Sequence, residues 1–247
     1  MEDSVIYLTL PQVALAFVPV VITLGILLYW SFGVGRALYA LARMLVQLLL
    51  IGYVLAWIFG AGSGALILLV LAIMLLAAAW IGVGTVSEHR WQLLAASLIS
   101  IAIGGGLTLA LVTQVVLQLD PWYLPRYMIP LAGMVFANAM TAVSLAAERL
   151  FAELKHGLNW PEARFAAYQA AMIPVINALL AVGLVSLPGM MTGQILSGVE
   201  PLEAVKYQIV IMFLIAAAAS MGAIGVCLLS YHRLFSGDHQ FRFDRLS

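Results

Sequence analysis

Charged side chains are scarce in this sequence. Only 9% of its 247 residues are Asp, Glu, Lys or Arg, whereas 64% are hydrophobic, and the mean hydropathy is +1.09. Uncharged apolar runs of about 18 residues or more are membrane spans, so this composition excludes a soluble domain. The 11 basic and 11 acidic residues cancel, and no nucleic-acid partner is therefore expected.

Cysteine is almost missing, and the chain starts without positive charge. Its one cysteine, Cys227, lies in a hydrophobic run and has no second cysteine with which to form an internal disulfide. The first residues, Met-Glu-Asp-Ser, are acidic, whereas a cleaved signal peptide begins with basic residues. We therefore expect the first apolar run to be retained as a span.

Catalytic and ion-coupling groups are also missing from the apolar runs. No Asp, Glu, Lys, Arg or His lies deep in a predicted span, and the histidines fall at or beyond span ends: His89, His156, His232 and His239. This disfavours ion-coupled carriers and intramembrane proteases. The chain also lacks a G-x-x-x-x-G-K-[ST] phosphate loop, so driven transport would take its energy from another polypeptide. We predict a chain without catalytic residues that binds no cofactor itself.

The long uncharged runs predict an all-α polytopic membrane protein. A span needs about 20 apolar residues, and a glycine-rich turn at 60–64 divides the longest run in two. The seven predicted spans cover residues 10–30, 44–59, 66–85, 91–117, 128–147, much of 170–196, and 207–229. No internal repeat or linker is visible, so we expect one membrane domain over residues 1–247.

Basic residues are distributed unevenly between the connections. With the N-terminus outside and the C-terminus in the cytoplasm, nine lie in cytoplasmic segments: Arg36, Arg43, Arg90, Arg149, Lys155, Arg164, Arg233, Arg242 and Arg245. Only Arg126 and Lys206 lie outside. This positive-inside bias predicts that orientation.

The one extended polar segment, residues 148–165, carries signals for a helix, a turn and a second helix. Apolar residues recur at helical spacing on one face: Ala147, Leu150 or Phe151, Leu154 and Leu158. Arg149 and Glu153 are four residues apart, Gly157 is placed to end the helix, and Asn159 with Glu162 forms a capping-box pattern. Such a segment either docks a partner protein or rests on the lipid surface. The candidate partner contacts are Arg149, Glu153, Gly157, Asn159, Glu162 and Arg164.

The run 181–196 carries Pro188-Gly189 and two further glycines, Gly183 and Gly193, inside a predicted span. Broken helices form binding sites and gates in transporters, although a kinked packing helix would show the same residues. The predicted pathway or gate residues are Gln47, Asn138, Thr141, Asn177, Ser186, Pro188, Gly189, Met190, Met191, Thr192 and Gln194. The polar members could instead hydrogen-bond neighbouring helices, and the methionines could be core filler or soft metal ligands.

Residues 183–196, Gly-Leu-Val-Ser-Leu-Pro-Gly-Met-Met-Thr-Gly-Gln-Ile-Leu, followed by Pro201-Leu202 and Tyr207-Gln208-Ile209, resemble the signature of the FetB-type ABC transporter permeases. Two further segments resemble the family's second and fifth spans: residues 43–55, and residues 125–140 with Pro125-Arg126-Tyr127-Met128-Ile129-Pro130-Leu131. The resemblance extends from about residue 36 to residue 235. Ala137 stands where the family pattern has Gly, and residues 155–160 are more polar than the family's run.

The resemblance implies a permease that acts as two copies with two separate ATPase subunits, which would hold the ATP and Mg²⁺. It implies export of iron or another metal across the inner membrane, and it assigns the coupling contact with the ATPase to residues 148–165. Export of a sugar nucleotide or a lipid-like molecule, or a non-transporting scaffold or sensor, remain alternatives. The sequence identifies no metal site.

Overall fold

The computed structural model describes residues 9–30, 33–61 and 63–234. The described chain is helical and contains no β-strand, which confirms the all-α prediction. Its contacts divide it into two compact units, residues 1–61 and 62–247, which we describe separately. The prediction of one membrane domain over the whole chain therefore stays a prediction.

The first unit holds three helices: α1 (Leu10–Leu15), α2 (Val18–Tyr29) and α3 (Val34–Ala61). Proline stands in the first turn of both α1 and α2, where its missing N–H leaves no intrahelical bond unmade. Helix α3 begins ten residues before the predicted span at residue 44. Arg36 and Arg43, which were predicted to lie in a connection, are part of the helix.

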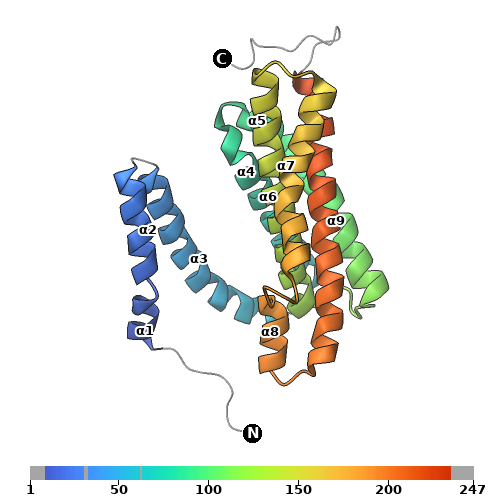
Figure 1. Cartoon of the computed structure of the whole chain (residues 1–247). Coiled ribbons are helices and arrows are strands. Elements are labelled where there is room, and N and C mark those ends of the chain that lie inside the picture. Colours follow the sequence, from blue (N-terminus) through green and yellow to red (C-terminus); the bar gives the residue numbers. More distant parts are fainter. Residues whose placement is uncertain (1–8, 31–32, 62, 235–247) are drawn as a thin grey trace. The chain divides into compact units, whose positions relative to one another are not determined.

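The second unit begins with α4 (Gly64–Gly82), a 3₁₀ segment η1 (Val83–His89), α5 (Arg90–Ala110) and a π-helical turn η2 (Leu111–Val116). It continues with α6 (Pro125–Lys155), α7 (Trp160–Ala181), the short α8 (Gly189–Leu196) and α9 (Pro201–Leu234), as Figure 1 shows. Seven stretches of the described chain are long and apolar enough to cross a membrane. The predicted number of spans is thereby confirmed, and the chain is a multi-pass membrane protein.

In the second unit, helix α9 packs against α5, α6, α7 and α8. Small residues allow the close approach of α5 and α9: a Cβ on Gly104 would lie 2.8 Å from the Cβ of Met221, and one on Gly225 would lie 2.9 Å from the Ser100 hydroxyl. In lipid the hydrophobic effect does not drive helices together, so their association depends on close van der Waals packing of small residues.

Two helices run past the ends that hydropathy predicts. Helix α6 continues to Lys155 without interruption, so the predicted amphipathic helix is the last part of the fifth span. Helix α7 begins at Trp160, ten residues before the predicted sixth span. The α6–α7 turn lies at the same end of this unit as the end of α9 (Figure 1), where the rings of Trp160 and Tyr231 are 4.9 Å apart.

Candidate functional site

The sixth span is broken over seven residues, 182–188, between α7 and α8. The carbonyl of Ala181 accepts from the amides of Leu184, Val185 and Ser186 at 3.3, 2.8 and 3.1 Å. Gly183 adopts φ +84°, and its amide donates to the Ser186 carbonyl at 2.9 Å. The left-handed conformation at Gly183 is available to glycine at little cost. The chain therefore leaves the helix six residues before Pro188, earlier than the sequence indicated.

Helix α8 begins directly after the break. Pro188 is its N-cap residue in an extended conformation, and no side chain caps its first turn. Gly189 has ordinary helical geometry, and a Cβ there would meet nothing within 4 Å. The hydroxyl of Thr192 donates to the Pro188 carbonyl at 3.1 Å, so this predicted pathway residue is used in holding the α8 turn.

A pocket of about 470 Å³ lies where the end of α7, the break, α8 and the start of α9 meet. We call it the break pocket. No charged side chain lines it, and its lining residues are Leu179, Val182, Gly183, Met191, Val205, Gln208, Ile209, Met212 and Phe213. Its volume is in the range of small-molecule sites, which are mostly apolar with a few polar groups.

Gln208 is the polar side chain of the break pocket, and it was not among the predicted pathway residues. It is only 6% exposed, and its Oε1 has no hydrogen-bond partner in the part of the chain that the structure describes. A buried carbonyl without a donor is destabilising by about 1–3 kcal/mol. The Oε1 of Gln194 on α8 is also buried and unpartnered within the described residues, but Gln194 does not line this pocket.

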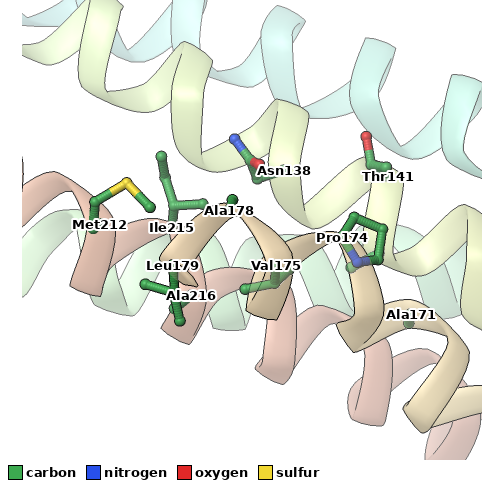
Figure 2. A pocket seen from close by; sticks show the side chains of 11 residues that line it. Asn138, Thr141, Ala171, Pro174, Val175, Ala178, Leu179, Met212, Ile215 and Ala216 are labelled. Atoms are coloured by element: carbon green, nitrogen blue, oxygen red, sulfur yellow. The ribbon is translucent and has the colours of Figure 1, made fainter. Parts of the chain in front are cut away.

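A smaller cavity of about 60 Å³ lies deeper, between α6, α7 and α9 (Figure 2). We call it the inner cavity. Its lining residues are Asn138, Thr141, Ala142, Ala171, Pro174, Val175, Ala178, Leu179, Met212, Ile215 and Ala216. A water needs about 10–15 Å³ of such volume, so this cavity has room for a few waters or one small ion.

The polar groups of the inner cavity are Asn138 and Thr141, one helical turn apart on α6. The Asn138 amide donates to the Met134 carbonyl at 2.8 Å, and the Thr141 hydroxyl donates to the Ala137 carbonyl at 2.9 Å. These bonds use donors and leave the Asn138 carbonyl oxygen and the Thr141 lone pairs as acceptors. Ser144, which shares their sequence spacing, instead contacts Thr85 of η1 at 3.2 Å between the hydroxyl oxygens.

Leu179 and Met212 line both the break pocket and the inner cavity. The two spaces are therefore neighbours along the α7–α9 interface, separated by two flexible apolar side chains. Predicted pathway residues occur in both: Met191 in the first, and Asn138 and Thr141 in the second. The arrangement can pass a small solute from one space to the other if Leu179 and Met212 change rotamer.

The remaining predicted pathway residues lie outside both linings. Asn177 and Ser186 are exposed on the surface of the second unit, while Pro188, Met190, Thr192 and Gln194 are partly buried around the break. Gln47 is exposed on α3 and belongs to the first unit, so it is not placed with respect to the cavities.

The α6–α7 turn has the local structure that the sequence predicts. Gly157 adopts φ +87°, the Leu158 amide donates to the Glu153 carbonyl at 3.1 Å, and the Gly157 amide donates to the Leu154 carbonyl at 3.1 Å. This pair of bonds is a Schellman motif. The Asn159 side chain accepts from the Glu162 amide at 3.0 Å and caps α7.

The apolar face of residues 147–154 is buried within the chain. Ala147, Leu150, Phe151 and Leu154 are at most 4% exposed, and Phe151 stacks on His89 of η1 at 5.0 Å. This face does not rest on lipid, because the protein covers it. The polar side stays accessible: Arg149 pairs with Glu153 at 2.5 Å with half of its side chain exposed. Glu162 is exposed and Arg164 is half-buried.

Within the described residues, no group of three or more His, Cys, Asp or Glu side chains is placed to hold a metal ion. The side-chain atoms of the two linings that could bind a metal ion are amide and hydroxyl oxygens and the thioether sulfurs of Met191 and Met212. Uncharged oxygen and thioether donors suit brief contact with a moving ion better than tight retention, because strong sites for hard cations use carboxylates.

Comparison with known proteins identifies relatives along most of the chain. It is 36% identical over 221 residues to a UPF0014 membrane protein of Synechocystis, covering 83% of this chain and 85% of the relative. It is 33% identical over 218 residues to the probable iron export permease protein FetB of Escherichia coli, covering 82% and 83%. It is 32% identical over 243 residues to the protein ALUMINUM SENSITIVE 3 of Arabidopsis thaliana, covering 90% and 87%.

No solved structure matches the chain. The family model of UPF0014, described as an uncharacterised protein family, matches residues 10–235. This agrees with the resemblance that residues 183–196 indicate. The chain is a multi-pass membrane protein that belongs to the UPF0014 family.

Proposed function

We propose that this chain is the permease subunit of an ABC transporter that exports iron or another metal ion across the inner membrane. The observation that carries the proposal is the broken sixth span, with two neighbouring cavities that share Leu179 and Met212. Non-helical backbone at membrane depth is tolerated where it is covered by protein or lines a cavity. The similarity to a probable iron export permease supports the choice of substrate.

The energy would come from a separate ATPase that docks at the α6–α7 turn. Arg149, Glu162 and Arg164 present charge next to a turn that a Schellman motif and an N-cap hold in one shape. Helix α7 leads directly from this turn to the break at 182–188. A push on the turn would therefore reach the break through one continuous helix. Two permease copies and two ATPase subunits would form the complex.

The cavities favour a metal ion over a sugar nucleotide as the transported species. Neither lining contains Lys or Arg, whereas diphosphate recognition generally uses cationic side chains or helix N-termini. The inner cavity, at about 60 Å³, also has no space for a nucleotide. Its Asn138 and Thr141 oxygens provide the acceptors that a partly hydrated cation needs.

The proposal is tested by reconstituting the chain with its ATPase in vesicles and measuring ATP-dependent uptake for a panel of metals and sugar nucleotides. We expect ATP-dependent uptake of one or more of the metals and no ATP-dependent uptake of UDP-glucose. Asn138→Leu should block metal uptake because the larger apolar side chain fills the inner cavity, whereas Asn138→Ala keeps the space and should retain part of it. Uptake that depends only on a sugar nucleotide, or no ATP-dependent uptake at all, would contradict the proposal.

A further inference from the structure

The break pocket is more apolar than a path for ions alone requires. Eight of its nine lining residues are apolar or glycine, and the ninth is Gln208. A hydrated ion gains little from such a surface, whereas an apolar body of small-molecule size gains from burial in about 470 Å³. The pocket therefore also suits an occupant of a different chemical class.

Gln208 shows what polar group that occupant carries. Its Oε1 is a hydrogen-bond acceptor, is shielded by the surrounding protein, and is unsatisfied within the described residues. A half-turn of the Gln208 amide brings this acceptor to the pocket that the residue lines, where a hydroxyl or an amide N–H on a ligand satisfies it. A cation is less suited to it, because one neutral oxygen in an apolar wall cannot replace a hydration shell.

The position of Gln208 along α9 sets the depth of the polar group. Glu203 and Lys206 form an exposed ion pair at 2.6 Å, with 51% and 70% of their side chains exposed. Such charges stay at the membrane–water interface. With a rise of about 1.5 Å per residue, Gln208 lies about 3 Å deeper than Lys206, and Met212 and Phe213 lie about 9–11 Å deeper.

The polar end of the pocket therefore lies at the level of lipid headgroups, and its apolar end lies in the hydrocarbon. We propose that the break pocket binds an uncharged amphiphile whose hydroxyl or amide N–H donates to Gln208 Oε1 and whose apolar body lies along Ile209, Met212 and Phe213. This goes beyond the proposed function, because the amphiphile need not be the transported species. Bound there, it would press on Leu179 and Met212, the residues between the two cavities.

The test uses the full chain in vesicles of dioleoylphosphatidylcholine, which has no hydroxyl to donate. A photoreactive monoacylglycerol serves as the probe, and mass spectrometry maps its crosslinks. Monoolein, which has hydroxyls, and methyl oleate, which has the same chain and no donor, compete with it. We expect crosslinks on α8 and the first three turns of α9, and about two- to tenfold stronger competition by monoolein, the value of one net hydrogen bond.

Variants isolate the role of the amide. Gln208→Leu should remove the preference for monoolein and raise the melting temperature of the ligand-free protein, because no unsatisfied carbonyl stays buried. Gln208→Met is a second variant of similar length in case leucine impairs folding. Gln169→Leu makes the same chemical change at an exposed position of α7 and should leave the preference unchanged.

Three results would overturn the proposal. Equal competition by monoolein and methyl oleate would contradict the hydrogen bond to Gln208. A preference for monoolein that persists in Gln208→Leu and Gln208→Met would contradict it as well. Probe crosslinks that fall only outside α8 and α9 would show that the amphiphile does not occupy the pocket.

Discussion

At the scale of single residues, Gly104 shows how closely α5 and α9 approach. A Cβ added there would lie 2.8 Å from the Met221 Cβ and 3.2 Å from the Gly222 amide nitrogen, so the helices would have to separate. We expect Gly104→Ala to be destabilising by about 1–3 kcal/mol, as for other overpacked sites. Thermal unfolding of the purified protein measures the change.

Gly106 on the same helix supplies the matched control, because a Cβ there would meet nothing within 4 Å. Gly106→Ala should be neutral or stabilising, since alanine is the better helix former by about 1 kcal/mol. Equal melting temperatures for the two variants would show that the α5–α9 contact is looser than described.

At the scale of elements, Gly157 ends α6 with a left-handed residue at the proposed ATPase contact. A Cβ there would meet no atom within 4 Å, so only the backbone conformation resists substitution. Gly157→Leu should cost about 1–2 kcal/mol locally and distort the Schellman turn. In the reconstituted complex we expect ATP hydrolysis to continue while the number of ions transported per ATP falls.

Gly157→Asn tests the same position with a side chain that tolerates the left-handed region. It should restore transport per ATP toward the native value. If Gly157→Leu transports normally, the turn is not the coupling contact; if both variants fail equally, the side chain and not the backbone shape is responsible.

The break between α7 and α8 depends on Gly183 more than on Pro188. Pro188 only caps α8, so replacing Pro188 and Gly189 by alanine would leave the turn at Gly183 in place. Gly183→Ala should instead strain that turn by about 1–2 kcal/mol and lower transport per folded molecule. Gly193→Ala, inside α8 in open space, is the control and should be as stable as the native chain. Unchanged transport by a well-folded Gly183→Ala protein would show that the break serves helix packing and is not a gate.

Features that local chemistry decides were predictable from the sequence. The helix end at Gly157 and the cap at Asn159 follow from a few neighbouring residues, and both are confirmed. Helix ends near the membrane surface were not predictable in this way. Glu148 and Arg149 mark where the apolar run stops, but backbone hydrogen bonding continues to Lys155. Hydropathy measures the environment of a side chain, and it does not measure whether the next turn stays helical.

The cavities were less predictable than the helices. Asn138, Thr141 and Met191 were recognised as polar or soft groups in spans, and they line the spaces described above. Gln208 is named in the sequence only as part of the family signature and not as a site residue, because its importance comes from its missing partner. That property depends on how α8 folds back on α9, which no spacing along α9 records.

At the scale of the whole molecule, the orientation in the membrane remains a prediction from the basic residues. The N-terminal and C-terminal positions that would report it directly, Ser4 and Ser247, lie outside the described residues. The second unit offers better reporters. The α6–α7 turn and the loop between α8 and α9 lie at opposite ends of it (Figure 1), with His156 and Glu200 exposed in them.

Single cysteines at these two positions test the orientation, and the native Cys227 is a silent background because it is fully buried. With the positive-inside arrangement, a membrane-impermeant maleimide should label Glu200→Cys in intact cells and His156→Cys only after the membrane is opened. The reverse pattern would place the α6–α7 turn outside, where no ATPase could reach it. Labelling of both from one face would mean that α7 and α8 together do not cross the membrane, and the broken span could then not form part of a transport path.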